Sequence, residues 1–173
     1  REGQPHDFVL GPIDLTFYPG EIVFIVGGNG SGKTTLAKLI TGLYLPEDGE
    51  IYLDDQPIGA DTRESYRQLF SVVFDGAVIF DKLWGLEAAD LDHRAREYLR
   101  ELQLEHAVSV SNGVLSTTNV SRGQRKRLAL LTAYLEDRPV YVFDEWAADQ
   151  DPAFRQAFYL RLLPELRNRG KTV

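Results

Sequence analysis

The sequence "GGNGSGKTT" occupies residues 27–35, between an apolar run and a stretch with helical periodicity. The run before it, "EIVFIV" at residues 21–26, is rich in β-branched and aromatic residues and is typical of a strand buried on both faces. The stretch after it, residues 31–41, is predicted to be a helix that Gly42 ends. A glycine-rich turn that joins such a strand to such a helix predicts a phosphate-binding loop, with the motif matched at Gly27, Gly32, Lys33 and Thr34.

The glycines of this loop have a physical purpose. They let the backbone fold tightly enough to aim several N–H groups at phosphate oxygens, and the helix start adds its partial positive charge. Lys33 would bridge the outer phosphates of a nucleotide, and the Thr34 hydroxyl would bind Mg²⁺. A chance glycine-rich turn is the alternative, but glycine makes up only about 7% of average sequences, so the full match is rare. The predicted nucleotide contacts are Gly27, Gly28, Asn29, Gly30, Ser31, Gly32, Lys33, Thr34 and Thr35.

A second apolar run ends in two acids, in "VYVFDE" at residues 140–145. The carboxyl ends of parallel strands meet at the edge where α/β sheets bind ligands, so we expect Asp144 and Glu145 beside the loop. Asp144 would hold Mg²⁺, directly or through water, and Glu145 would polarise a water for in-line attack on a γ-phosphate. Two solvated acids at a strand end are the alternative, which the neighbouring phosphate loop disfavours.

These runs, with "FSVVF" at residues 70–74, are three buried strands separated by helical stretches. They predict an α/β fold of the P-loop NTPase type with a mostly parallel sheet. Residues 50–58 alternate in polarity around Asp54 and Asp55, which predicts an antiparallel hairpin at the edge. Asp151 is the expected N-cap of the last of three further helices, at about 92–102, 123–136 and 152–163. We expect one domain over residues 1–173, with a core at about 1–75 and 136–173 and an inserted, mainly helical subdomain at about 76–135.

The segment "NVSRGQRKRLALL" at residues 119–131 begins a helix with four cations, Arg122, Arg125, Lys126 and Arg127. Basic residues are unfavourable at a helix N-terminus unless an anion offsets them. Ser121 is a suitable N-cap, Gly123 lets a backbone approach closely, and Gln124 adds a neutral donor. These residues predict a second anion site, whose anion would be the terminal phosphate of a nucleotide. A capped surface helix with solvated basic residues remains the alternative.

Composition narrows the function further. The net charge of −7 argues against nucleic acid as a partner, because binding to its backbone needs an excess of Lys and Arg. The sequence has no cysteine, so it has no disulfide and no thiolate metal site, and its three histidines lack metal-ligand spacing. No apolar run approaches the roughly 18 residues of a membrane span. Both ends are expected to continue in a longer protein, since residues 172–173 begin a strand that we expect to be too short to pair.

In this order and spacing, the phosphate loop, the Ser-Arg-Gly-Gln segment 88 positions after Lys33 and the Asp144-Glu145 pair resemble the ATP-binding cassette of ABC transporters. The resemblance implies an ATPase that uses ATP and Mg²⁺, with Lys33 and Glu145 as catalytic residues. It also implies a second cassette as partner. The signature of one cassette, Ser121, Arg122, Gly123 and Gln124, would cover the γ-phosphate held by the other, and Asp151 would be the D-loop aspartate.

The chain departs from the family pattern at two charged positions. Arg122 replaces the first glycine of the signature, and Asp75 stands where most cassettes carry a glutamine that reaches Mg²⁺. A carboxylate at position 75 is a further candidate metal ligand. The adenine-stacking aromatic residue and a γ-phosphate histidine are expected outside residues 1–173, so this stretch alone should hydrolyse ATP poorly. Phe8 could substitute for the stacking residue, but its sequence context favours a strand residue packed in the core.

Segments such as "DEWAADQDP" at residues 144–152 resemble bacterial exporters of cyclic peptides and peptide siderophores, in which a membrane domain precedes the cassette in one polypeptide. This resemblance implies a position at the cytoplasmic face of the bacterial inner membrane. Exposed aromatic residues near Phe80, Leu83 and Trp84 would mark a docking surface, although a buried cluster is an equal alternative. A non-transport ABC ATPase and a non-catalytic nucleotide-binding regulator are the alternative functions; Glu145 argues against the regulator.

Overall fold

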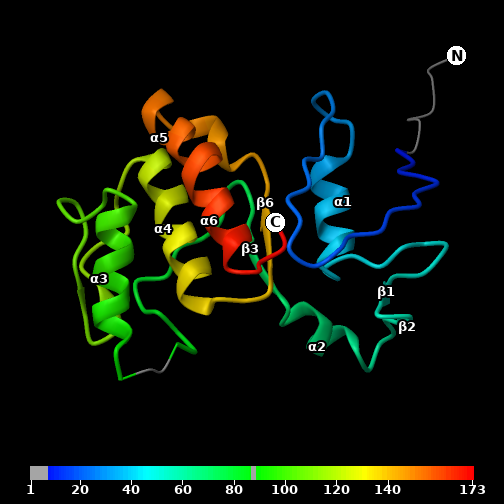
Figure 1. Ribbon diagram of the computed structural model, residues 1–173, viewed down its shortest axis with the longest axis horizontal. Coiled ribbons are helices and arrows are strands. Elements are labelled where there is room, and N and C mark those ends of the chain that lie inside the picture. Colours follow the sequence, from blue (N-terminus) through cyan, green and yellow to red (C-terminus); the bar gives the residue numbers. More distant parts are fainter. Residues whose placement is uncertain (1–7, 87–88) are drawn as a thin grey trace, which may run out of the picture.

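The computed structural model describes residues 8–86 and 89–173 (Figure 1). Its helices are α1 (Lys33–Ile40), α2 (Arg63–Arg67), α3 (Leu91–Glu101), α4 (Arg122–Glu136), α5 (Pro152–Ala157) and α6 (Leu163–Asn168). Its strands are β1 (Tyr52–Leu53), β2 (Gln56–Pro57), β3 (Phe70–Val73), β4 (Val110–Ser111), β5 (Val114–Leu115) and β6 (Val140–Phe143). A 3₁₀ turn, η1 (Trp146–Asp149), follows β6, and a π-helical turn, η2 (Phe158–Leu162), joins α5 to α6.

The predicted parallel sheet is present and centres on β3 and β6. These two strands pair in parallel, with Phe70 opposite Val140 at one end and Val73 opposite Phe143 at the other. Thr172 forms a parallel bridge to Val140 on the other side of β6. Together with the matches to solved structures reported below, this arrangement confirms the α/β P-loop fold.

Residues 21–26, the first predicted strand, do not form a strand buried on both faces. Among the described residues, the strand-like backbone bonds of this run are to Val173, which donates to the carbonyl of Glu21 at 2.9 Å and accepts from the N–H of Val23 at 2.7 Å. The last two residues therefore do pair, contrary to expectation. Beyond Val23 no described strand lies alongside, so Phe24 is 62% and Val26 is 87% exposed, although the sequence predicted burial on both faces. An apolar run is buried only where a neighbouring element covers it.

Helix α4 lies at the centre of the core. It contacts α3 on one side and β3 and η1 on the other, and Figure 1 shows α1 beyond the paired strands. Leu128, Leu130 and Leu131 are fully buried in this helix, and most of the other residues from Lys126 to Leu135 are buried as well. Apolar side chains all round the helix explain this position, because a helix with a single apolar stripe would expose its other face.

Two hairpins flank the core. The predicted hairpin is present as β1 and β2, with Asp54 and Asp55 both at positive φ in the turn. A second hairpin, β4 and β5, lies within residues 76–135, so that this segment is less helical than predicted. Its turn is Asn112-Gly113, with φ of 53° and 69°, and Asn-Gly is the strongest short hairpin signal in a sequence.

The predicted helices are present with shifted ends. Asp151 caps α5 as expected, because its side chain accepts a hydrogen bond from the N–H of Phe154 at 2.9 Å. The helix that begins there extends through η2 and α6 to Asn168, five residues beyond the predicted end. Among the helices of residues 8–86 and 89–173, none is both long and apolar enough to cross a membrane.

Candidate functional site

The glycine-rich loop turns into α1 at Gly32, whose φ of 90° lies in the left-handed region that favours glycine. A side chain there would also collide with Phe8 and Leu10, which come within 2.8 and 2.9 Å of the position of a Cβ. The ammonium of Lys33 donates to the carbonyl oxygens of Gly27 at 3.1 Å and Gly28 at 3.0 Å. Lys33 therefore spans the loop from its end back to its beginning.

The loop meets the end of β6 through one hydrogen bond. The hydroxyl of Thr34, at the start of α1, donates to Asp144 Oδ2 at 2.8 Å. Asp144 is 8% exposed, and its N–H is bonded to the carbonyl of Val73 at 3.0 Å, so the paired strands β3 and β6 fix its position. Residues 110 positions apart in the sequence thus bring together the two oxygen groups that were predicted to bind Mg²⁺.

The described residues fit part of a metal site, whose remaining oxygens would come from a bound nucleotide. Within residues 8–86 and 89–173, no cluster of three or more Asp, Glu or His side chains could hold a metal by itself. Mg²⁺ keeps few protein ligands and is usually bound with substrate phosphates. The Thr34 hydroxyl and the Asp144 carboxylate are therefore a suitable protein share of such a site.

Glu145 follows Asp144 with an exposed side chain and an unusual backbone. Its φ of 49° and ψ of 26° place it in the left-handed region, which is costly for a residue with a Cβ. Its carbonyl accepts a hydrogen bond from Lys126 Nζ at 2.8 Å. An exposed carboxylate beside a buried one matches the different roles predicted for the two acids.

The start of α4 is capped as predicted and lies at the surface. The Ser121 hydroxyl accepts from the N–H of Gln124 at 3.3 Å, and the Gln124 side-chain carbonyl accepts from the N–H of Ser121 at 3.1 Å. Gly123 has a reason within the chain itself, because a Cβ there would lie 2.7 Å from the carbonyl oxygen of Asp149. The close backbone approach that Gly123 was predicted to allow is that of its own chain.

The cations of α4 are largely neutralised by carboxylates of the same chain. Arg122 lies 3.3 Å from Asp75 and 3.2 Å from Asp149, and Lys126 lies 2.9 Å and 2.6 Å from the same two groups. Burial lowers the pKa of Lys126, but Asp149 and Asp75 outweigh it and hold the pKa above its ordinary value. Hydrogen bonding from Lys126, with Arg122 adding to it, holds the pKa of Asp75 below its ordinary value.

Arg127 makes a separate network with the D-loop candidate. It donates to Gln150 Oε1 at 2.8 Å and to Asp151 Oδ2 at 2.5 Å, and its guanidinium lies 3.6 Å from the centre of the Phe154 ring. Lys126 and Arg127 are only 6% and 8% exposed, so the alternative of solvated basic residues is wrong for both. Asp149 and Gln150 were not predicted as partners of these two cations. The one sequence feature that indicates them is the polar run "DQD" at 149–151.

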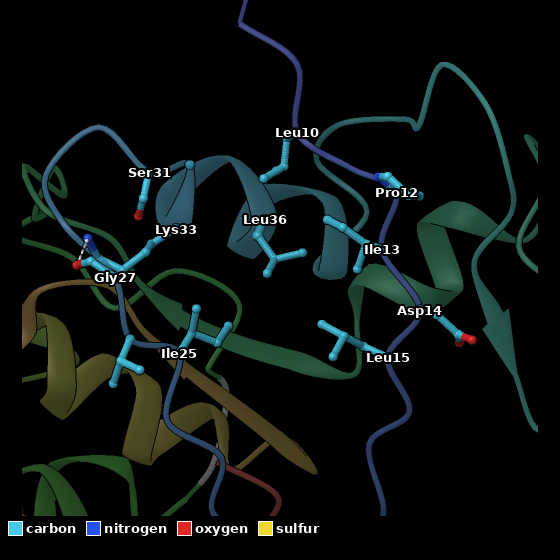
Figure 2. A pocket seen from close by; sticks show the side chains of 12 residues that line it. Leu10, Pro12, Ile13, Asp14, Leu15, Ile25, Gly27, Ser31, Lys33 and Leu36 are labelled. Carbon is cyan, nitrogen blue, oxygen red and sulfur yellow. Dashed lines mark hydrogen bonds between the residues drawn. The ribbon is translucent and has the colours of Figure 1, made fainter.

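A cavity of about 410 Å³ lies against the loop. In Figure 2, Leu10, Ile13 and Leu15 gather around it with Ile25 and Leu36. Gly27, Ser31, Gly32 and Lys33 also line it, so its wall is partly aliphatic and partly the loop itself.

Two aromatic predictions have mixed outcomes. Phe8 is 60% exposed and lies outside any strand, against the Gly32 end of the loop, so the core interpretation is wrong. The chain around it is packed on one side only among the described residues, which leaves its ring open to solvent. Phe80 and Trp84 are exposed, whereas Leu83 is buried in the core.

Taken together, the parallel sheet and the groups at its edge define a P-loop nucleotide-binding domain. The family model described as "ABC transporter" matches residues 10–148, which is most of the chain. The chain therefore belongs to the ABC transporter family.

Individual relatives agree with this family. The chain is 52% identical over 169 residues to "ATP-binding protein SyrD" of Pseudomonas syringae pv. syringae, covering 96% of this chain and 30% of the relative. It is 38% identical over 161 residues to "ATP-dependent lipid A-core flippase" of Alkalilimnicola ehrlichii, covering 84% and 27%. A solved structure titled "Structure of ATP binding subunit of ABC transporter" superposes with a TM-score of 0.70 at 29% identity, over 88% of this chain and 66% of that one. The chain thus spans less than a third of the length of these two curated relatives.

Proposed function

We propose that this chain binds ATP at the glycine-rich loop and hydrolyses it as the ATPase domain of an exporter. The observation that carries the proposal is the 2.8 Å bond between the Thr34 hydroxyl and Asp144, which joins the loop to the strand-end acids. Loop residues 27–35 would bind the phosphates through backbone N–H groups, and Lys33 would exchange its loop carbonyls for phosphate oxygens. Thr34 and Asp144 would hold Mg²⁺, which when bound supplies neutralising charge at the β- and γ-phosphates.

Glu145 is the proposed general base. Its carboxylate is exposed, one residue beyond the proposed metal ligand, so it is free to orient a water and accept its proton as the water attacks the γ-phosphate. Asp144, buried and bonded to Thr34, is unsuited to that role because its Oδ2 is already engaged. The αL backbone of Glu145 is consistent with a functional position, since strained conformations concentrate at such sites.

We also propose that a second copy of the cassette completes each site. Ser121 is exposed at the start of α4, as a residue that contacts a partner's nucleotide must be, with Arg122, Gly123 and Gln124 beside it. Asp151 is exposed, and in this arrangement it would serve as the D-loop residue. The core at about 1–75 and 136–173 would carry the loop, and residues 76–135 would form the inserted subdomain.

We further propose that ATP hydrolysis by this chain drives transport. The names of the relatives, an ATP-binding protein and a lipid A-core flippase, favour an exporter at the cytoplasmic face of the bacterial inner membrane. The membrane domain would belong to the same full-length chain, since the match covers so little of each relative. A cyclic peptide or peptide siderophore is the proposed cargo. Phe80 and Trp84, both exposed, would contribute to the surface that meets the membrane domain.

The test is the Glu145→Gln substitution in the full-length protein. ATP turnover should fall by at least about 100-fold while ATP binding is kept, because the amide cannot accept a proton. The matched control is Glu47→Gln, which changes an exposed carboxylate of the loop after α1 and should leave turnover unchanged. Undiminished turnover in the Glu145 variant would show that another group positions the water.

A further inference from the structure

Glu145 needs a support for its unusual backbone. Residues with a side chain remain in the left-handed region only where their surroundings hold them there. The carbonyl oxygen of Glu145 is held by two donors, the Lys126 ammonium at 2.8 Å and the N–H of Ala148 at 3.2 Å. The lysine comes from α4, so the main chain of the proposed base is tied to the signature helix.

Lys126 is joined to this turn from both ends. Its side chain donates to Glu145, and its own carbonyl accepts from the indole N–H of Trp146 at 2.9 Å. Trp146 is 2% exposed and stacks on Phe158, with ring centres 4.2 Å apart, so it cannot shift easily. Two consecutive residues, Glu145 and Trp146, are therefore hydrogen-bonded to a single residue of α4.

The ammonium of Lys126 lies among three oxygens. It donates to the Glu145 carbonyl at 2.8 Å and forms ion pairs with Asp149 Oδ2 at 2.6 Å and Asp75 Oδ1 at 2.9 Å. The side chain is only 7% exposed. A buried ion pair adds little net stability over an apolar replacement of similar shape, so stability alone does not account for this arrangement.

We propose that Lys126 is a positioning residue for the hydrolysis reaction, which holds the main chain of Glu145 so that its carboxylate faces the nucleotide. Asp149 and Asp75 brace the lysine. Asp75 then acts through Lys126 and Arg122 and is not a Mg²⁺ ligand. The inference rests on the proposed role of Glu145. In this role Lys126 links two parts of the proposed machinery. The start of α4 would cover the nucleotide held by the partner cassette, and Glu145 would act on the nucleotide held by its own chain.

The principal test is Lys126→Met in the full-length protein. We expect kcat to fall about 10- to 100-fold, because small misplacements of a reacting group have effects of this size. The KM for ATP and the affinity for a fluorescent ATP analogue should change by less than about twofold, since Lys126 contacts no loop residue. The matched control is Arg167→Met, which removes an exposed cation of α6 and should leave kcat unchanged.

A second variant separates positioning from stability. Lys126→Met takes the nearer of two cations from the partly buried Asp149, which lowers the melting temperature; adding Asp149→Asn removes that charge and should recover much of the loss. The kcat of the double variant should stay low, because the bond to Glu145 is still missing. Recovery of kcat together with melting temperature would make the role structural and overturn the proposal. If the single variant does not fold, the double variant gives the answer.

Two further measurements complete the design. Asp75→Asn changes a half-exposed side chain and should lower kcat severalfold with the same half-saturating Mg²⁺ concentration. A higher Mg²⁺ requirement with unchanged kcat at saturation would make Asp75 a metal ligand and overturn its role as a brace. Glu145→Gln is measured alongside: if it retains turnover, the proposed role of Glu145 fails and the positioning role with it, whereas loss of turnover there with normal kcat in Lys126→Met refutes the positioning role alone.

Discussion

Replacing Gly123 by alanine tests the packing of α4 against the turn after β6. The added Cβ would lie 2.7 Å from the carbonyl oxygen of Asp149, well inside van der Waals contact. Neither side can give way easily. Gly123 O accepts from Gln150 Nε2 at 3.1 Å, and the Asp149 carboxylate lies 2.6 Å from Lys126. The clash is with backbone, so relief requires the helix and the turn to separate.

The magnitude follows from two opposing effects. Overpacking of this kind costs about 1–3 kcal/mol, and alanine is favoured over glycine within a helix by about 0.5–1 kcal/mol. We therefore expect Gly123→Ala to lower the free energy of unfolding by about 1–2 kcal/mol. For a domain of this size, each kcal/mol corresponds to about 2–4 °C, so the melting temperature should fall by about 2–8 °C.

The assay is thermal unfolding without nucleotide, followed by the fluorescence of the buried Trp146. The control is Gly59→Ala, because no atom lies within 4 Å of a Cβ at Gly59 and its backbone is not in the left-handed region. That variant should stay within about 0.5 kcal/mol of the parent. If Gly123→Ala were as stable as Gly59→Ala, the close approach of Asp149 would not exist in solution, and glycine would be needed there for another reason.

Three other predictions follow from separate contacts. The Asp92 carboxylate accepts N–H bonds from Gly113 and Asn112, which hold its pKa below the usual value; it therefore stabilises the fold above the unfolded pKa of about 3.9, and this contribution is lost as pH falls through the folded pKa. Melting temperatures of the parent and Asp92→Asn should thus differ at pH 7 and converge as the pH falls below the folded pKa, and a difference that grows with acidity would contradict this. Arg127→Met removes the donor to Gln150 Oε1 and Asp151 Oδ2 and should lower the free energy of unfolding by about 1–3 kcal/mol in urea titrations; a loss below about 0.5 kcal/mol would show that the network is not formed. The 173-residue chain should hydrolyse ATP more slowly than a version extended through the expected γ-phosphate histidine, and equal steady-state rates would refute that expectation.

Local patterns in the sequence predicted much of the architecture because they depend on neighbours in the chain. Asp151 as N-cap and the Asp54-Asp55 turn are decided by backbone groups within a few residues. The Asn112-Gly113 turn is specified just as locally, although the segment around it was predicted to be mainly helical. The run at residues 21–26 shows the limit of such patterns, since its apolar character could not reveal how little of it another strand covers.

The sequence by itself determined the glycine-rich loop, the acids that end β6 and the capped start of α4, because each is specified by residues adjacent along the chain. Only the tertiary structure decided which charges meet. Asp75, Asp149 and Lys126 come from three separate elements, and their spacing in the sequence contains no information about distance. The crowded cations of α4 predicted a phosphate nearby; folding also places carboxylates against Arg122, Lys126 and Arg127, because a buried cation must find its anion wherever the packing brings one.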